Sequence, residues 1–174
     1  HRRENYGKPM RNIFEAVRNT AKRFPDVIFV YPVHLSPVVR QAAGELLSGL
    51  PNVKLIEPLD AVDMHRLMAK SYMVMTDSGG LQEEAPALGK PVLVLRRETE
   101  RPEAVEAGTV VLAGTEREKI ELLAAKLLTD RAEYEKMARA VNPYGDGRAC
   151  PRIADAICYA FGLSDRRPEE FMAK

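Results

Sequence analysis

The segment that most constrains the fold is 72–86, in which a short apolar stretch runs into the sequence DSGG and continues with helix-forming residues. The apolar part is typical of a strand, and the two glycines allow the backbone to turn sharply and expose its N–H groups. The first N–H groups of a helix lack intrahelical partners and lie at the positive end of its dipole, so they attract phosphate. The segment predicts that Ser78, Gly79 and Gly80 hold a diphosphate.

Two glutamates follow this turn, at positions 83 and 84. Glu84 lies about one helical turn beyond the glycines, where its carboxylate suits the vicinal hydroxyls of a ribose whose phosphates lie on the turn. The alternative is an ordinary strand-to-helix turn with Glu83 and Glu84 in solvent. The local motif alone favours neither interpretation.

Strand-like and helix-like stretches alternate along the rest of the chain. Gly, Pro and capping residues separate them, with Asp60, Thr115 and Asp130 as expected helix caps. We expect strands at 27–33, 53–56, 72–76, 91–95 and 109–112. We expect helices at 11–24, 37–47, from Asp60 to about Lys70, after the glycines, and at 116–128, 131–140 and 153–161, with a polar loop at 96–103.

This alternation predicts an α/β fold with a Rossmann-like, doubly wound, mostly parallel sheet. Ligands of such sheets bind at the carboxyl ends of the strands. The residues that follow the predicted strands are therefore site candidates, namely His34, Leu59 with Asp60, 78–80, and Arg96 to Arg101. The chain has neither a GxGxxG nor a Walker sequence, which argues against a dinucleotide dehydrogenase or a phosphoryl-transfer ATPase.

Composition excludes several other classes. The 174 residues are 45% hydrophobic and 29% charged, with a formal net charge of +1, which suits one globular domain without a nucleic-acid partner. No apolar run approaches the roughly 20 residues that span a bilayer, so we expect no membrane segment and a cytoplasmic location. Cys150 and Cys158 have no metal-type spacing with the histidines; we expect two free thiols and no metal site.

Several candidate residues have plain structural interpretations. Arg101 stands between two glutamates and could form only a surface ion pair, although its loop favours a diphosphate or sugar contact. A histidine after a strand, such as His34, is more often structural than functional, and we take His65 as structural. The first residues, His1 to Glu4, could be a solvated end of the chain.

Five motifs in a fixed order decide between these interpretations. Together they resemble the non-hydrolysing UDP-N-acetylglucosamine 2-epimerases over nearly the whole chain. The resemblance covers only the C-terminal half of such an enzyme. The motifs are HRREN at 1–5, YPVHLSP at 31–37, DSGGLQEEAPALGKPVLVLR at 77–96, TERPEA at 99–104 and NPYGDG at 142–147.

The resemblance implies two facing Rossmann-like domains of the GT-B type. Residues 1–174 would form the C-terminal, UDP-binding domain, with 1–10 as interdomain linker and 163–174 as a tail. The N-terminal domain would be absent from this chain. The sequence begins with His1 rather than methionine, which agrees with a missing upstream part.

The resemblance also assigns roles to residues. It implies His1 as the active-site histidine, Ser78, Gly79 and Gly80 as diphosphate ligands, Glu84 as the ribose ligand and Arg101 as a substrate contact. Leu59 and Met64 match positions near the uracil. Arg2 and His34 match positions that touch a second UDP-N-acetylglucosamine acting as allosteric activator.

The implied reaction interconverts UDP-N-acetylglucosamine and UDP-N-acetylmannosamine by elimination and re-addition of UDP, without a cofactor. The complete enzyme is expected to be a homodimer that uses UDP-N-acetylglucosamine as substrate and activator. Three alternatives remain open: a hydrolysing epimerase, the donor domain of a GT-B glycosyltransferase, and a non-catalytic nucleotide-sugar sensor.

Overall fold

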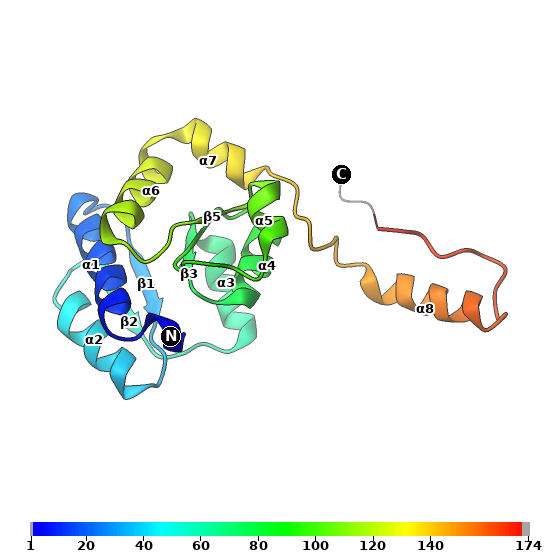
Figure 1. Ribbon diagram of the computed structural model, residues 1–174, viewed down its shortest axis with the longest axis horizontal. Coiled ribbons are helices and arrows are strands. Elements are labelled where there is room, and N and C mark those ends of the chain that lie inside the picture. Colours follow the sequence, from blue (N-terminus) through cyan, green and yellow to red (C-terminus); the bar gives the residue numbers. More distant parts are fainter. Residues whose placement is uncertain (1, 172–174) are drawn as a thin grey trace.

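The computed structural model describes residues 2–171, in which helices and short strands alternate (Figure 1). A 3-10 helix, η1 (Arg3–Asn5), precedes the α-helices. These are α1 (Lys8–Arg23), α2 (Pro37–Leu47), α3 (Ala61–Lys70), α4 (Gly79–Ala87), α5 (Pro102–Ala107), α6 (Arg117–Thr129), α7 (Arg131–Ala138) and α8 (Ala149–Ala160). The strands are β1 (Phe29–Pro32), β2 (Val53–Ile56), β3 (Val74–Thr76), β4 (Val92–Val94) and β5 (Val110–Leu112).

The strand pairings are parallel, as the sequence predicts. β1 pairs with β2, and β3, β4 and β5 form a second sheet in that order. We expected one sheet, and the division into two hydrogen-bonded sheets is a difference. Partly buried Tyr31 of the first sheet and Met75 of the second nevertheless pack against one hydrophobic cluster. The two sheets therefore share a core.

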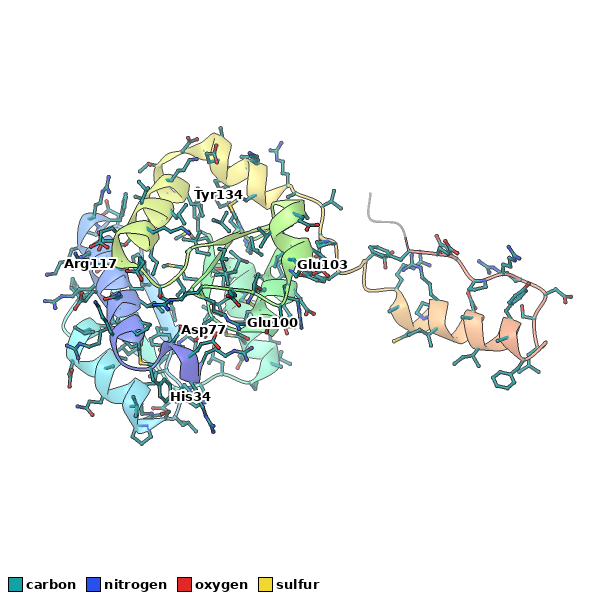
Figure 2. All side chains as sticks on the ribbon, viewed as in Figure 1. His34, Asp77, Glu100, Glu103, Arg117 and Tyr134 are labelled. Carbon is teal, nitrogen blue, oxygen red and sulfur yellow. The ribbon has the colours of Figure 1, made fainter. Side chains whose placement is uncertain are left out.

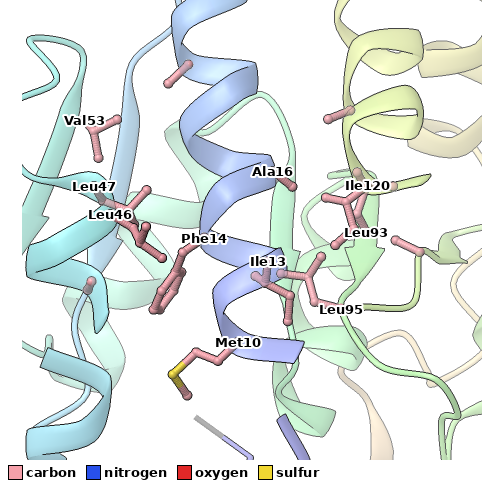
Figure 3. Close-up of a cluster of buried hydrophobic side chains, with 14 of the residues drawn as sticks. Met10, Ile13, Phe14, Ala16, Leu46, Leu47, Val53, Leu93, Leu95 and Ile120 are labelled. Atoms are coloured by element: carbon pink, nitrogen blue, oxygen red, sulfur yellow. The ribbon is translucent and has the colours of Figure 1, made fainter. Parts of the chain in front are cut away.

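Helices cover both faces of the second sheet, which confirms the doubly wound arrangement. Side chains alternate along β4: Leu93, together with Leu95 just after the strand, joins one cluster, and Val92 and Val94 join the other. The first cluster, which we call the large cluster, receives side chains from α1, α2, α6 and α7 (Figure 3). The second, the small cluster, is built with Met68 of α3, Ala85 of α4, Ala104 of α5 and Val110 of β5.

Local sequence explains most element boundaries. The Asp60 side chain accepts a hydrogen bond from the Asp63 N–H at 2.8 Å, and Asp130 accepts from the N–H groups of Ala132 and Glu133. These two predicted caps are confirmed. The predicted capping box at Thr115 is wrong, because the N-cap of α6 is Glu116 and the Thr115 side chain is buried.

The loop after β4 differs from the prediction. Its last two residues begin α5, which runs from Pro102 to Ala107 and is followed by Gly108 in the left-handed conformation. Proline at the first helical position and glycine after the last one are the usual signals of such a short helix. The irregular loop is therefore shorter than predicted and ends at Arg101, the N-cap of α5.

Helix α8 lies apart from the other elements (Figure 1). It starts at Ala149, four residues before its predicted start at Ile153, and none of its residues is buried within the described chain. Its apolar side chains include Ile153 and Ile157, which are more than half exposed. This helix adds nothing to either cluster.

Candidate functional site

A pocket of about 550 Å³ opens where β1 and β3 end. The N-terminal segment also contributes to this pocket. The carboxyl ends of the strands therefore gather candidate residues, as the fold rule predicts. The pocket is lined by Arg2, Arg3, Glu4, Tyr6, His34 and Ser78. The predicted catalytic residue, His1, lies outside the described residues.

Asp77 ties the N-terminal segment to the end of β3. Its Oδ2 accepts hydrogen bonds from the backbone N–H of Arg2 at 2.9 Å and from Nδ2 of buried Asn5 at 3.2 Å. Asn5 Nδ2 also donates to the carbonyl oxygen of Leu95. Burial alone would raise the pKa of Asp77, but hydrogen bonds, those from Arg2 and Asn5 among them, hold it below the usual value.

The same segment meets the loop after β4 through ion pairs. Arg96 pairs with Glu4 at 2.8 Å and with Glu100, and Glu100 also lies 3.5 Å from Arg2. The backbone N–H of Glu100 and the two guanidinium groups hold the pKa of this carboxyl below its usual value. Figure 2 shows Asp77 and Glu100 on the same side of the core as His34.

The start of α4 lies close to two charged side chains. Neither Gly79 nor Gly80 has a positive φ, so the backbone there does not require glycine for its conformation. A Cβ on Gly79 would lie 3.1 Å from Oε1 of Glu100 and 3.5 Å from Nη2 of Arg2. These contacts leave little room for a side chain. The close approach keeps the N-terminus of α4 near both charged groups.

The Glu84 carboxylate lies over the glycine turn. Its Oε1 would be 3.4 Å from a Cβ on Gly80, so this oxygen faces the start of the helix. Its Oε2 is 2.9 Å from Nε2 of His65 on α3. A ribose whose phosphates bind the glycine turn would lie within reach of this carboxylate.

Arg101 is held against α4 by side chain and backbone. Its guanidinium pairs with Glu83, and its backbone N–H donates to Thr99 Oγ1 at 3.1 Å. The same hydroxyl donates to Oε1 of Gln82 at 2.6 Å. Gln82 is fully buried, and its Nε2 has no hydrogen-bond partner among residues 2–171. One helix therefore supplies the glycine turn, Glu84 and the two residues that fix the Arg101 loop.

The two residues predicted near the uracil lie on the α3 side of this helix. Met64 is partly buried and packs against the small cluster, while Leu59 immediately precedes the cap of α3. Their proposed contact with a base stays a prediction.

Sequence reasoning missed four residues that organise the site. Asp77 and Asn5 lie inside quoted motifs, but a hydrogen bond between segments 72 residues apart has no local signal. Gln82 resembles any polar helical residue until its burial is known. His65 was taken as structural, yet it contacts the predicted ribose ligand; its position on the helix after the second strand was the available signal.

Other kinds of site find no support in residues 2–171. No group of three or more His, Cys, Asp or Glu side chains there could hold a metal ion. Both cysteines are free, as expected. No helix in this part of the chain is long and apolar enough to cross a membrane.

A parallel α/β domain with a glycine turn and a carboxylate above it has the arrangement expected of a nucleotide-binding domain. Solved structures agree with this class. The chain superposes with a TM-score of 0.94 and 50% identity on Staphylococcus aureus MnaA in a co-structure with UDP, covering 99% of this chain and 47% of that one. UDP-GlcNAc 2-epimerase from Neisseria meningitidis bound to UDP-GlcNAc gives 0.86 and 50% identity, over 90% of this chain and 42% of that one.

Sequence comparison then gives the family. The family model for UDP-N-acetylglucosamine 2-epimerase matches residues 1–158. The chain is 56% identical to UDP-N-acetylglucosamine 2-epimerase of Bacillus subtilis over 174 residues, which is all of this chain and 46% of that protein. The chain therefore belongs to the UDP-N-acetylglucosamine 2-epimerase family. It spans about half the length of the curated relatives it matches.

Proposed function

We propose that this chain is the C-terminal, UDP-binding half of a non-hydrolysing UDP-N-acetylglucosamine 2-epimerase. The observation that carries the proposal is the Glu84 carboxylate above the glycine turn of α4. In this arrangement the N–H groups of Gly79 and Gly80 bind the diphosphate, and Glu84 accepts hydrogen bonds from the ribose hydroxyls. The co-structure of a 50% identical relative with UDP supports it.

The proposed reaction is an elimination followed by re-addition. A base removes the C2 proton of the sugar, the bond from C1 to the UDP oxygen breaks, and a 2-acetamidoglucal forms. UDP then adds back to C1 while a proton is delivered to the opposite face of C2. The departing diphosphate gains negative charge, which N–H groups and cations stabilise.

This chain supplies the groups for the leaving diphosphate. The N-terminus of α4 provides N–H groups and a positive dipole end, Arg2 provides positive charge beside it, and Arg101 pairs with Glu83 on the same helix. Glu83 and Glu100 are paired with arginines, which argues against either as the C2 base. We place the C2 acid and base outside this chain.

An allosteric role for Arg2 and His34 belongs to the same proposal. Both residues line the 550 Å³ pocket beside Ser78, so a second nucleotide sugar there would adjoin the diphosphate site. Coupling between two adjacent sites requires a difference in binding free energy between two states. In the complete enzyme, His34→Ala should reduce activation by UDP-N-acetylglucosamine more strongly than it reduces substrate affinity. Equal reductions of activation and of substrate affinity would contradict the assignment.

Three measurements test the main proposal. Calorimetry of this chain should detect UDP binding, and a coupled assay should detect no epimerisation by the chain alone. The complete enzyme in deuterated water should incorporate deuterium at C2 and release some UDP with the glycal. Epimerised product without deuterium would contradict elimination.

The alternatives differ in their products. A hydrolysing epimerase would release free N-acetylmannosamine, and a glycosyltransferase would transfer the sugar to an added acceptor. A sensor would bind UDP-sugars in the complete protein without turnover.

A further inference from the structure

The residue that meets the predicted ribose ligand comes from a different helix. His65 of α3 places Nε2 at 2.9 Å from Oε2 of Glu84 on α4. Both side chains are about half exposed, at 54% and 46%. Met68 of α3 and Ala85 of α4 are both buried in the small cluster. The pair is therefore a solvent-exposed contact between two helices that contribute to the same cluster.

The contact leaves the other carboxylate oxygen on the side of the ligand. Oε1 of Glu84 faces Gly80, at 3.4 Å from the place of a Cβ there. An ionised carboxylate offers about four lone-pair positions. One bond from His65 to Oε2 therefore restricts the rotation of the carboxylate but leaves acceptors free for two hydroxyl groups.

We propose that His65 is a positioning residue, which holds the Glu84 carboxylate in the orientation that binds the ribose hydroxyls. This inference rests on the proposed UDP site. A free glutamate on a helix surface samples several rotamers, and binding a ligand must freeze one of them. Holding that rotamer before the ligand arrives raises affinity, because the ordering cost no longer falls on the binding step.

A purely structural role fits the geometry less well. His65 is exposed, so its removal leaves no cavity in either cluster. Exposed ion pairs also contribute little to folding stability. The effect of His65 should therefore appear in ligand binding, and specifically in the part of binding that involves the ribose hydroxyls.

The experiment measures by calorimetry the affinity of the chain for UDP and for 2′,3′-dideoxy-UDP, which lacks both hydroxyls. His65→Ala should weaken UDP binding about threefold to tenfold, the range expected for ordering one flexible side chain. It should change the binding of 2′,3′-dideoxy-UDP less than about twofold. Uracil and diphosphate contacts are common to both ligands, so they cancel in this comparison.

Two further variants separate positioning from other effects. His65→Gln keeps an N–H donor near the place of Nε2 and should restore most of the UDP affinity. Arg66→Ala, the neighbouring residue on α3, removes a side chain that pairs only with Asp63 within residues 2–171 and should change neither affinity. If His65→Ala weakens the binding of both nucleotides equally, the positioning role of His65 is wrong, but the proposed function is not affected. Failure of the unaltered chain to bind UDP would overturn the proposed function, and the inference with it.

Discussion

The two faces of the β3–β4–β5 sheet differ in what they contain. The large cluster has 18 buried apolar residues among those described, and it joins α1, α2, α6 and α7 to the sheet. The small cluster has six buried apolar residues, and the helices around it carry charged or polar groups at their edges. One of these helices, α4, even buries Gln82 with an amide nitrogen that lacks a partner in residues 2–171.

This difference separates stability from binding. Apolar area removed from water contributes about 25 cal/mol per Å², so most folding stability should come from the large cluster. The face with the small cluster keeps fewer apolar contacts and accepts a buried, half-satisfied amide, an arrangement that costs stability. What it gains is a glycine turn with a carboxylate and an arginine fixed beside it. The predictions below test this separation in order of expected effect.

Ile120→Ala should produce the largest loss of stability. Ile120 is fully buried in the large cluster, and such a truncation removes apolar contacts and leaves a cavity, at a cost of about 2–5 kcal/mol. Urea denaturation measures the loss, and calorimetry of the folded variant should give unchanged UDP affinity. If the alanine variant does not fold, Ile120→Val can replace it, with an expected loss of stability of about 0.5–1.5 kcal/mol. If a folded variant binds UDP more weakly, the large cluster also contributes to binding, and stability and binding are not separate.

Glu84→Ala should have the opposite pattern. Loss of hydrogen bonds to a charged acceptor should weaken UDP binding by about 1–3 kcal/mol, while the exposed position of Glu84 leaves stability nearly unchanged. Glu83→Ala is the matched control: it removes a partly exposed ion pair to Arg101, so its effect should stay below about 1 kcal/mol. Calorimetry with UDP compares the two. Equal losses would mean that both glutamates, rather than Glu84 alone, serve the ligand.

The elements of this fold were accessible from the sequence because their signals are local. The helix 37–47 and the strand 53–56 have the predicted bounds, since proline and glycine mark their ends. Asp60 and Asp130 cap helices as their spacing indicates. Thr115 has the same spacing to a glutamate, but its burial in the core overrode the local preference.

The contacts within the site were less accessible. The sequence indicated the glycine turn and Glu84, because a strand, two glycines and a helix follow one another directly. It could not indicate that His65 reaches Glu84, or that Asn5 reaches Asp77, because these pairs depend on how separate segments pack. It also attributed the glycines to a sharp turn, whereas neither has a positive φ and Gly79 instead lies close to the side chains of Glu100 and Arg2.

Thr99→Val should have a smaller effect than the two changes above. It keeps the shape of the side chain but removes the hydroxyl that joins Gln82 to the backbone N–H of Arg101. We expect a loss of about 1–2 kcal/mol in stability, because two hydrogen bonds are lost and buried Gln82 loses its partner, and weaker UDP binding because the Arg101 loop is no longer fixed. Urea denaturation and calorimetry measure both. Thr99→Ser, which keeps the hydroxyl, should restore both quantities; a serine variant as weak as the valine variant would show that the hydroxyl is not what matters.

The smallest effect is expected outside both clusters, on α8. Ile157 is about half exposed, and no residue of α8 is buried against the rest of the described chain. Unfolding therefore changes the surroundings of this side chain little, and serine and isoleucine have similar helix propensities, so Ile157→Ser should stay within about 0.5 kcal/mol of the unaltered chain. The same substitution at a buried position, Ile120→Ser, is the control and should destabilise strongly. Urea midpoints compare the two variants. Comparable losses of stability in the two variants would mean that α8 packs on the domain in solution. The contrast between the two faces of the sheet would then have to include the apolar contact made by α8.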